Sequence, residues 1–261
     1  MLDFKILGSG AGTGVPSFFC DCPGCQESRL KPEYNRTRSG ALITTRKGNV
    51  LIDASPDIRI QLIRDRISQI EYIFLTHWHY DHMGGLGEFE FYVRLERINK
   101  LPLYLPPGAV DNFAGVFPHL MDVFDIIPWQ FNKCYDFGDV FLTPLEARHS
   151  IETAGILVES KKKRLAYFPD TAGLPEETAK KVQGVDCLIC DATFHGENWF
   201  PNSHMTAEQA IALGKQINAK QTLLTHMSIH YSQAVTTEQL EKEISEYPGV
   251  MISHDGMNIE L

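Results

Sequence analysis

The chain has 261 residues, of which 43% are hydrophobic, 10% aromatic and 22% charged. This length and composition exclude a disulfide-stapled mini-protein and a globally disordered chain, because the apolar surface is large enough to offset chain entropy. The formal charge is −9, from 24 Lys and Arg against 33 Asp and Glu. A surface of that sign repels polyanions, so extended nucleic acid is disfavoured as a main partner.

The location of the protein is indicated by its apolar runs and its cysteines. No apolar run approaches the roughly 20 residues that cross a bilayer, and the N-terminal residues lack the apolar core of a signal peptide. Three of the six cysteines crowd together at Cys20, Cys22 and Cys25. That spacing suits a metal in a reducing compartment better than a disulfide framework. The sequence therefore predicts a cytosolic (cytoplasmic) protein with no membrane segment.

Short strands alternate with helices along the whole chain, and no linker or repeat interrupts them, so residues 1–261 are predicted to form one α/β domain. Short, apolar, β-branched or aromatic runs predict strands at Phe4–Leu7, Ala41–Thr45, Val50–Asp53, Tyr72–Leu75, Leu103–Leu105, Val140–Leu145, Ile156–Glu159, Leu165–Phe168, Cys187–Cys190 and Thr222–Thr225. Helical apolar periodicity predicts helices at Pro56–Asp65, Gly87–Arg97, Pro175–Gln183, Ala207–Ile217 and Glu238–Glu246. A capping box formed by Thr206 and Gln209 opens the fourth of these helices.

Acidic residues and histidines follow several predicted strands. They are Asp53, His77, Asp170 and His226. The carboxyl ends of strands in open α/β sheets are where such folds build their sites, so these side chains are predicted to share one edge.

Four potential metal ligands, His77, His79, Asp81 and His82, lie within six residues directly after a predicted strand. In an extended segment His77 and His79 face the same way. A turn after Tyr80 then brings Asp81 and His82 to a second point nearby. The segment therefore suits two adjacent metal ions, since imidazole is the commonest metal ligand.

This spacing resembles the H-x-H-x-D-H signature of the metallo-β-lactamase superfamily. The resemblance implies a four-layer αββα sandwich of two mixed β-sheets flanked by helices, with a dinuclear site on one edge. It implies that the ligands of one metal are His77, His79 and His149, that those of the other are Asp81, His82 and His226, and that Asp170 bridges both.

Two catalytic divalent metals, Zn²⁺ or Mn²⁺, follow from this ligand set, because histidine and carboxylate ligands suit both ions. A water between the two ions would ionise to hydroxide near neutral pH, and that hydroxide is the predicted nucleophile. Asp81 is thereby a catalytic residue as well as a ligand. Asp53 resembles the upstream aspartate of the family and is predicted to accept a hydrogen bond from the histidine segment. The alternative for Asp53 is a simple turn former at a strand end.

The three clustered cysteines predict a second kind of metal site. Cys20, Cys22 and Cys25 lie in a predicted loop insertion at residues 18–30, and a tetrahedral zinc needs a fourth ligand. His230, four residues after His226, is the best candidate, which gives a structural Zn²⁺ with three cysteines and one histidine. The alternative is a loop with three reduced thiols.

Two further motifs are interpreted without a functional role. Cys187 and Cys190 form a C-x-x-C pair, but they lie inside an apolar strand, so they are predicted to pack in the core. The basic run 161–164 lies between two predicted strands and is predicted to be a solvated hairpin tip.

A C-x-C-x₂-C segment after a glycine-rich loop resembles the PhnP group, the cyclic-phosphate phosphodiesterases of the carbon–phosphorus lyase pathway. The residues that carry this resemblance are 12–16, 20–25 and 170–175. The chain resembles PqqB-type proteins of pyrroloquinoline quinone biosynthesis more distantly, and the intact H-x-H-x-D-H string favours PhnP. In one departure from the PhnP pattern, His226 and His230 lie four residues apart instead of three.

His204 matches the PhnP histidine that assists the leaving group. Because it lies just before a capped helix, His204 would bind a phosphoryl oxygen or protonate a departing alkoxide. The alternative is an ordinary surface imidazole.

The PhnP resemblance implies a metal-dependent phosphodiesterase for a small, cyclic phosphate diester, such as a phosphorylated ribose 1,2-cyclic phosphate. It also implies a homodimer and a small-molecule partner. Four alternatives stay open: a tRNase Z-like RNA-processing enzyme, a cyclic-nucleotide phosphodiesterase, a thioester or lactone hydrolase, and a non-catalytic PqqB-like protein. Metal content distinguishes the non-catalytic PqqB-like protein from an enzyme, since the former would bind about one zinc per chain and the latter about three metals.

Overall fold

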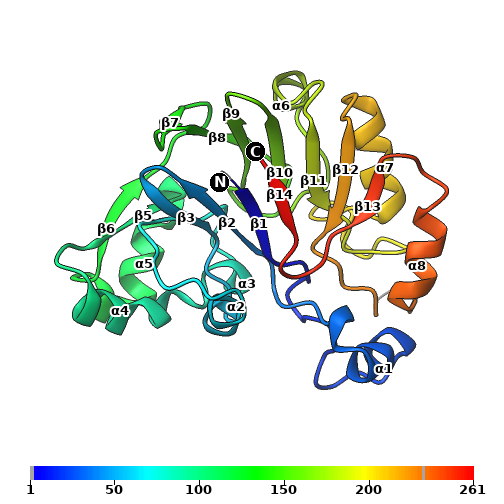
Figure 1. Ribbon diagram of the computed structural model, residues 1–261, viewed down its shortest axis with the longest axis horizontal. Helices are drawn as coiled ribbons and strands as arrows, with labels where there is room; N and C mark the ends of the chain where they lie inside the picture. Colours follow the sequence, from blue (N-terminus) through cyan, green and yellow to red (C-terminus); the bar gives the residue numbers. More distant parts are fainter. Residues whose placement is uncertain (1–2, 231–232) are drawn as a thin grey trace.

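The computed structural model describes residues 3–230 and 233–261, which form two seven-stranded sheets (Figure 1). The first sheet has the strand order β14-β1-β2-β3-β4-β5-β6. Its strands are β1 (Asp3–Gly8), β2 (Gly40–Thr45), β3 (Gly48–Ile52), β4 (Tyr72–Phe74), β5 (Leu101–Leu105), β6 (Phe124–Pro128) and β14 (Asn258–Glu260). Strands β3 to β6 run parallel, and β14, β1, β2 and β3 pair antiparallel.

The second sheet has the order β13-β12-β11-β10-β9-β8-β7. Its strands are β7 (Tyr135–Asp136), β8 (Val140–Glu146), β9 (Ala154–Ser160), β10 (Arg164–Phe168), β11 (Cys187–Asp191), β12 (Gln221–Thr225) and β13 (Val250–Ile252). Strands β10 to β13 run parallel, whereas β7 to β10 pair antiparallel. Both sheets are therefore mixed, as predicted.

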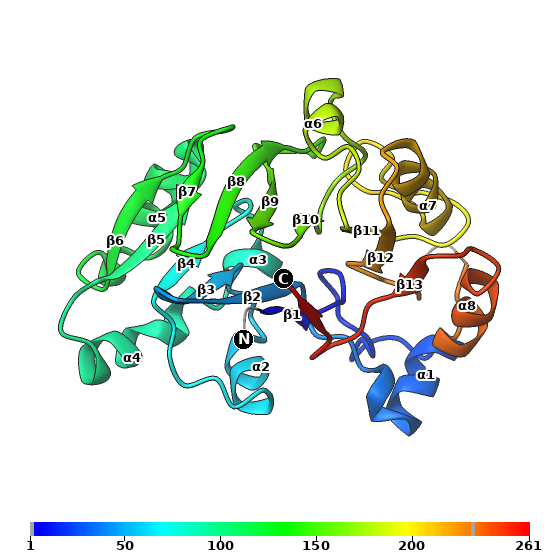
Figure 2. The same cartoon turned by 45° about the horizontal axis from the view of Figure 1, so that its top comes forward.

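The sheets pack face to face over a core that includes Phe4 and Phe74 from the first sheet and Tyr167 and Ile189 from the second. Helices α2 (Ile58–Arg64), α4 (Phe89–Glu96) and α5 (Val110–Val116) cover the outer face of the first sheet. Helices α6 (Glu176–Lys181), α7 (Ala207–Gln216) and α8 (Thr237–Ile244) cover the second sheet (Figure 2). This order of layers confirms the predicted αββα sandwich.

The remaining helices are short. They are α1 (Pro23–Leu30), α3 (Tyr80–Met83) and the 3₁₀ turns Pro32–Tyr34, Leu86–Glu88, Pro107–Ala109 and Pro118–Leu120. The capping box of α7 is confirmed, because Thr206 Oγ1 accepts from Gln209 N at 3.2 Å and Gln209 Oε1 accepts from Thr206 N at 2.9 Å. No helix among the described residues is long and apolar enough to span a membrane.

Every predicted strand and helix has a counterpart in the structure, but four strands and three helices lacked a prediction. The missed strands are β6, β7, β13 and β14, which are the edge strands of the two sheets. An edge strand pairs on one side only and carries little of the apolar pattern that marks a central strand. Helix α1 lies within the predicted loop 18–30; it is polar overall and buries small or polar residues, so no apolar stripe marks it.

Candidate metal centre

The two sheets bring their strand ends to one site. In the first sheet Asp53 follows β3 and His77 follows β4; in the second Asp170 follows β10, Asp191 ends β11, and His226 follows β12. The backbone turns sharply at two of these positions, where Asp53 and His226 have φ values of 64° and 56°. Non-glycine residues rarely adopt this left-handed conformation, and such strain concentrates at functional sites.

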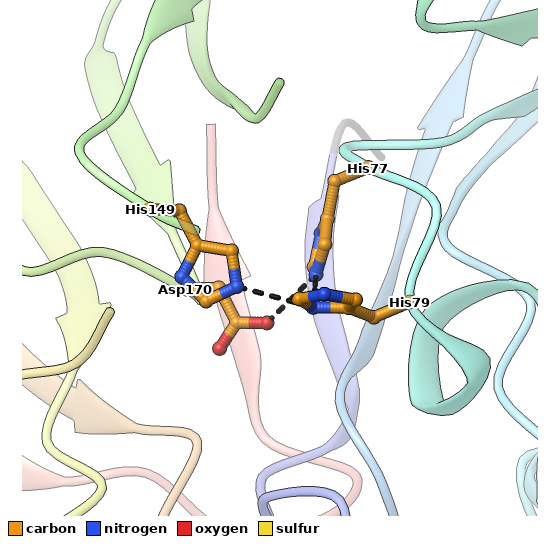
Figure 3. A group of neighbouring side chains, drawn as sticks. All are labelled: His77, His79, His149 and Asp170. Atoms are coloured by element: carbon orange, nitrogen blue, oxygen red, sulfur yellow. Dashed lines mark hydrogen bonds and ion pairs between the residues drawn. The ribbon is translucent and has the colours of Figure 1, made fainter. Parts of the chain in front are cut away.

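One group of side chains consists of His77, His79, His149 and Asp170, whose ligand atoms all lie within 4.8 Å of one another (Figure 3). His77 Nε2 lies 3.0 Å from His79 Nδ1. His149 Nε2 lies 3.1 Å from the same atom of His79. Asp170 Oδ2 completes the group at 3.1 Å from His77 Nε2. The structure thus assembles the set expected for one metal.

The second group consists of Asp81, His82, His226 and, again, Asp170. His82 Nε2 lies 2.8 Å from Asp170 Oδ2, and His226 Nε2 lies 2.9 Å from Asp170 Oδ1. The one-turn helix α3 replaces the predicted turn after Tyr80 and carries both Asp81 and His82. The glycine-rich loop packs against this group, because a Cβ at Gly12 would lie 3.2 Å from Asp81 Oδ2.

The residues present fit a pair of metal ions. His82 Nε2 and Asp170 Oδ1 are buried and make no hydrogen bond to the described residues. Each nevertheless faces another ligand atom at close range: Asp170 Oδ2 lies 2.8 Å from His82 Nε2, and His226 Nε2 lies 2.9 Å from Asp170 Oδ1. They therefore converge on common points instead of bonding to each other. Imidazole nitrogens facing one another at 3.0–3.1 Å also need a proton or a cation between them. Nitrogen and carboxylate ligands of this kind suit zinc and manganese.

Burial and charge act differently on the two groups. Burial lowers the pKa of His77 to about 3, so this imidazole is neutral and ready to bind a metal. Burial also lowers the pKa of His226, but the facing Asp170 carboxylate outweighs that effect and raises the pKa to about 10. Without metal the second group therefore holds protons, which a metal ion would displace.

Contacts behind the ligands hold their orientation. The predicted hydrogen bond to Asp53 is present, because His82 Nδ1 lies 2.8 Å from Asp53 Oδ2. His149 Nδ1 donates to the Ser203 carbonyl at 2.8 Å, and His226 Nδ1 lies 2.9 Å from Thr193 Oγ1. These outer partners occupy Nδ1 and leave Nε2 for the centre, which is how metal-binding histidines are commonly held.

His204 lies at the open side of the two groups. Its ring centroid is 5.2 Å from that of His149 and 5.3 Å from that of His226, so it borders both. Its Nδ1 lies 2.7 Å from Asp191 Oδ2 and 3.5 Å from Asp170 Oδ1. The side chain is 18% exposed, whereas that of Asp170 is 2% exposed.

Asp191 was not predicted as a site residue from the sequence. Its Oδ1 accepts from the N–H groups of Thr193 and Met205, both at 3.0 Å, and its Oδ2 faces His204. Burial lowers the pKa of His204, but the charge of Asp191 outweighs it and raises the pKa. The signal was available, because Asp191 directly follows the predicted strand Cys187–Cys190, as Asp170 follows another.

The cysteine cluster is also assembled. Cys20, Cys22 and Cys25 place their sulfur atoms within 4.8 Å of one another. His230 Nδ1 lies 3.5 Å from Cys25 Sγ, and His230 Nε2 lies 2.9 Å from Thr13 Oγ1. His230 therefore lies beside Cys25, but the group of ligand atoms that all lie within 4.8 Å of one another contains the three cysteines and not His230, whose role as fourth zinc ligand stays a prediction.

The six cysteines are expected to react with a thiol reagent in three steps. In metal-loaded native protein only the exposed Cys134 reacts quickly, and a chelator adds the three clustered thiols. Cys187 and Cys190 react only after unfolding, because burial raises the pKa of both thiols, that of Cys187 to about 12. Titration with an aromatic disulfide measures the counts, and Cys134→Ser serves as the control. Rapid reaction of all four non-core thiols before chelation would contradict the zinc site.

Residues 48–227 match the family model of the beta-lactamase superfamily domain. The match spans more than half of the chain, so the chain belongs to the beta-lactamase superfamily. This family contains metal-dependent hydrolases, which agrees with the two ligand groups described above.

Known proteins resemble the chain over its whole length. Coenzyme PQQ synthesis protein B of Methylobacterium sp. (strain 4-46) is 28% identical, over 98% of this chain and 99% of that protein. The crystal structure of a new diphosphatase from the PhnP family is 26% identical with a TM-score of 0.87, covering 100% of this chain and 98% of the other. The Zn²⁺-bound PqqB of Methylobacterium extorquens is 23% identical with a TM-score of 0.82, covering 99% and 100%, and shares the fold.

Proposed function

We propose that the protein is a metal-dependent phosphodiesterase that hydrolyses a small, cyclic phosphate diester. The observation that carries the proposal is the position of His204, whose ring centroid lies within 5.3 Å of that of a histidine from each ligand group and whose Nδ1 lies 2.7 Å from Asp191 Oδ2. A phosphoryl group that lies across both metal positions therefore has His204 beside it.

The residues of the site have different roles in this reaction, as metal ligands or as a proton donor. His77, His79 and His149 would hold one metal, Asp81, His82 and His226 would hold the other, and Asp170 would serve both. When bound, the metal pair supplies an ionised water and neutralises phosphoryl charge. Asp191 holds the Nδ1 proton of His204, so Nε2 is the nitrogen left to donate to the phosphoryl oxygen or the leaving alkoxide.

Similarity supports hydrolysis at phosphorus, because the relative described as a new diphosphatase from the PhnP family shares 26% identity along the whole chain. The whole-length match to coenzyme PQQ synthesis protein B favours a second candidate, a non-catalytic protein of cofactor biosynthesis. Metal content separates the two, since the phosphodiesterase requires about three metals per chain and the second candidate about one.

Protein reconstituted with Mn²⁺ or Zn²⁺ is expected to hydrolyse cyclic phosphates, and the His77→Ala variant is expected to lose that activity. The reason is that His77 is a central ligand of the first group, 3.0 Å from His79 and 3.1 Å from Asp170. The assay panel holds cyclic phosphates, including phosphorylated ribose 1,2-cyclic phosphate, together with linear diesters, monoesters, thioesters and lactones.

A matched control is His254→Ala, which removes an exposed histidine whose Nδ1 lies 3.0 Å from the Asp255 carbonyl oxygen, outside the site. Turnover of a thioester or lactone with no turnover of any diester would keep the hydrolase class and overturn the substrate class. Full diesterase activity in His77→Ala would contradict the metal site itself.

A further inference from the structure

A cavity of about 340 Å³ opens beside the first ligand group, on the side of His79. Its wall includes Trp78, His79, Gly108, Asn112, Ile151 and Glu152. The volume falls within the range of small-ligand pockets. Because His79 belongs to both the cavity and the metal centre, a substrate whose phosphate lies at the metals can extend into this space.

One wall of the cavity is a fixed aromatic surface. Trp78 lies between two ligands in the sequence and is half-buried. Two rings of the α5 region contact it edge-on, Phe113 at 6.2 Å and 71° and Phe117 at 6.3 Å and 77°. These contacts hold the indole in place before a ligand arrives. A held indole offers a flat, apolar surface on which another ring can lie.

The polar part of the cavity is acidic. The Gly108 N–H donates to Glu152 Oε2 at 3.0 Å, which anchors this exposed carboxylate at the cavity. The contact is close, since a Cβ at Gly108 would lie 3.1 Å from the same oxygen. Among the described residues, no lysine or arginine lines this cavity. A ligand with N–H or O–H donors therefore finds an acceptor here, whereas a second anionic group in this cavity meets the negative charge of Glu152.

We infer that the substrate of this centre carries an uncharged ring bearing N–H or O–H donors, which lies on Trp78 and donates to Glu152. This inference rests on the proposed phosphodiesterase function and narrows it. It predicts a higher kcat/KM for cyclic phosphates with a neutral ring than for the phosphorylated ribose cyclic phosphate, which carries a second phosphate. A nucleobase and a sugar-like ring share the required chemistry, so the experiment includes both.

The test measures kcat/KM for four cyclic phosphates at low ionic strength. They are guanosine 2′,3′-cyclic phosphate, its 5′-phosphorylated form, myo-inositol 1,2-cyclic phosphate and glycerol 1,2-cyclic phosphate, which has no ring besides the cyclic phosphate itself. A ring is expected to raise kcat/KM about tenfold over glycerol cyclic phosphate. The second phosphate is expected to lower it about three- to tenfold, and added salt should shrink that penalty.

Three variants test which residue causes the preference for a ring and which causes the penalty for a second phosphate. Trp78→Leu is expected to reduce the preference for a ring, and Glu152→Gln to abolish the penalty for the second phosphate. Gly108→Ala displaces the anchored carboxylate without removing it and is expected to reduce the same penalty partly. Glu146→Gln is the matched control, because Glu146 is an exposed carboxylate that lines a neighbouring cavity and not this one; both ratios should stay as in the wild type.

The outcomes separate this inference from the proposed function. Hydrolysis of glycerol cyclic phosphate with no preference for either ring overturns the inference alone. A preference for the second phosphate that persists in Glu152→Gln overturns it too. No hydrolysis of any of the four compounds by metal-loaded protein overturns both the inference and the phosphodiesterase. A preference for guanosine or for inositol, lost in Trp78→Leu, supports the inference and identifies the kind of ring.

Discussion

Replacing Asp170 by asparagine is expected to empty both catalytic metal positions at once and to lower diesterase activity by more than about a thousandfold. Asp170 is the one residue common to the two ligand groups, with Oδ2 near His77 and His82 and Oδ1 near His226. Asparagine keeps the shape but removes the negative charge that offsets two divalent ions. Elemental analysis should then find about one metal per chain instead of about three.

The remaining metal in this variant is expected to be the cysteine-bound zinc, because that cluster shares no ligand with Asp170. Thiol titration of the same sample distinguishes the two sites. Asp122→Asn is the control; it removes an exposed carboxylate that pairs with Arg94 at 2.8 Å, outside the site. Retention of both catalytic metals with activity within about tenfold of the wild type would show that Asp170 does not bridge the centre.

The metal ligands that lie close together in the chain could be predicted from the sequence, because residue spacing alone determines how they are arranged. His77, His79, Asp81 and His82 lie within one strand end and one helical turn, so their spacing alone brings them together. The central strands were equally predictable, since both of their faces are covered and their sequences are continuously apolar. Asp170 and His226 follow other strands, and their strand-end positions predicted that they share an edge with His77; the family resemblance was needed to add His149 and to assign all three as ligands.

The rest depends on contacts between distant segments, which spacing does not encode. Asp191 follows a predicted strand, but its contact with His204 emerged only once β11 was placed beside β10 and β12. The cavity at Trp78 requires α5 and the segment around Glu152 to meet beside His79, although they lie about 40 residues apart in the chain. The edge strands were missed for the same reason, because an edge strand is defined by its pairing with a neighbouring strand more than by its own sequence.

Replacing His204 by alanine is expected to lower kcat about 10²- to 10⁴-fold for diesters with alkoxide leaving groups. For p-nitrophenyl diesters the loss should be much smaller, because p-nitrophenolate leaves without a proton. The comparison of the two leaving groups in one variant separates proton donation from phosphate binding, which would lower both rates equally. Metal content should stay at the wild-type value if the two ligand groups hold the metals, since both are complete without His204; a lower content would instead assign a metal to the group that His204 forms with Asp170, Asp191 and His226.

Asp191→Asn is expected to give a weaker form of the same defect, with a shifted pH profile. In the wild type Asp191 lies 2.7 Å from His204 Nδ1 and raises its pKa against the opposing effect of burial. Without that charge the pKa of His204 falls, so the protonated imidazole is lost at lower pH as the pH rises. The basic limb of the kcat profile for alkoxide diesters should therefore move to lower pH, and the profile for p-nitrophenyl diesters should not move. An unchanged basic limb would mean that Asp191 orients the loop around His204 without tuning its proton.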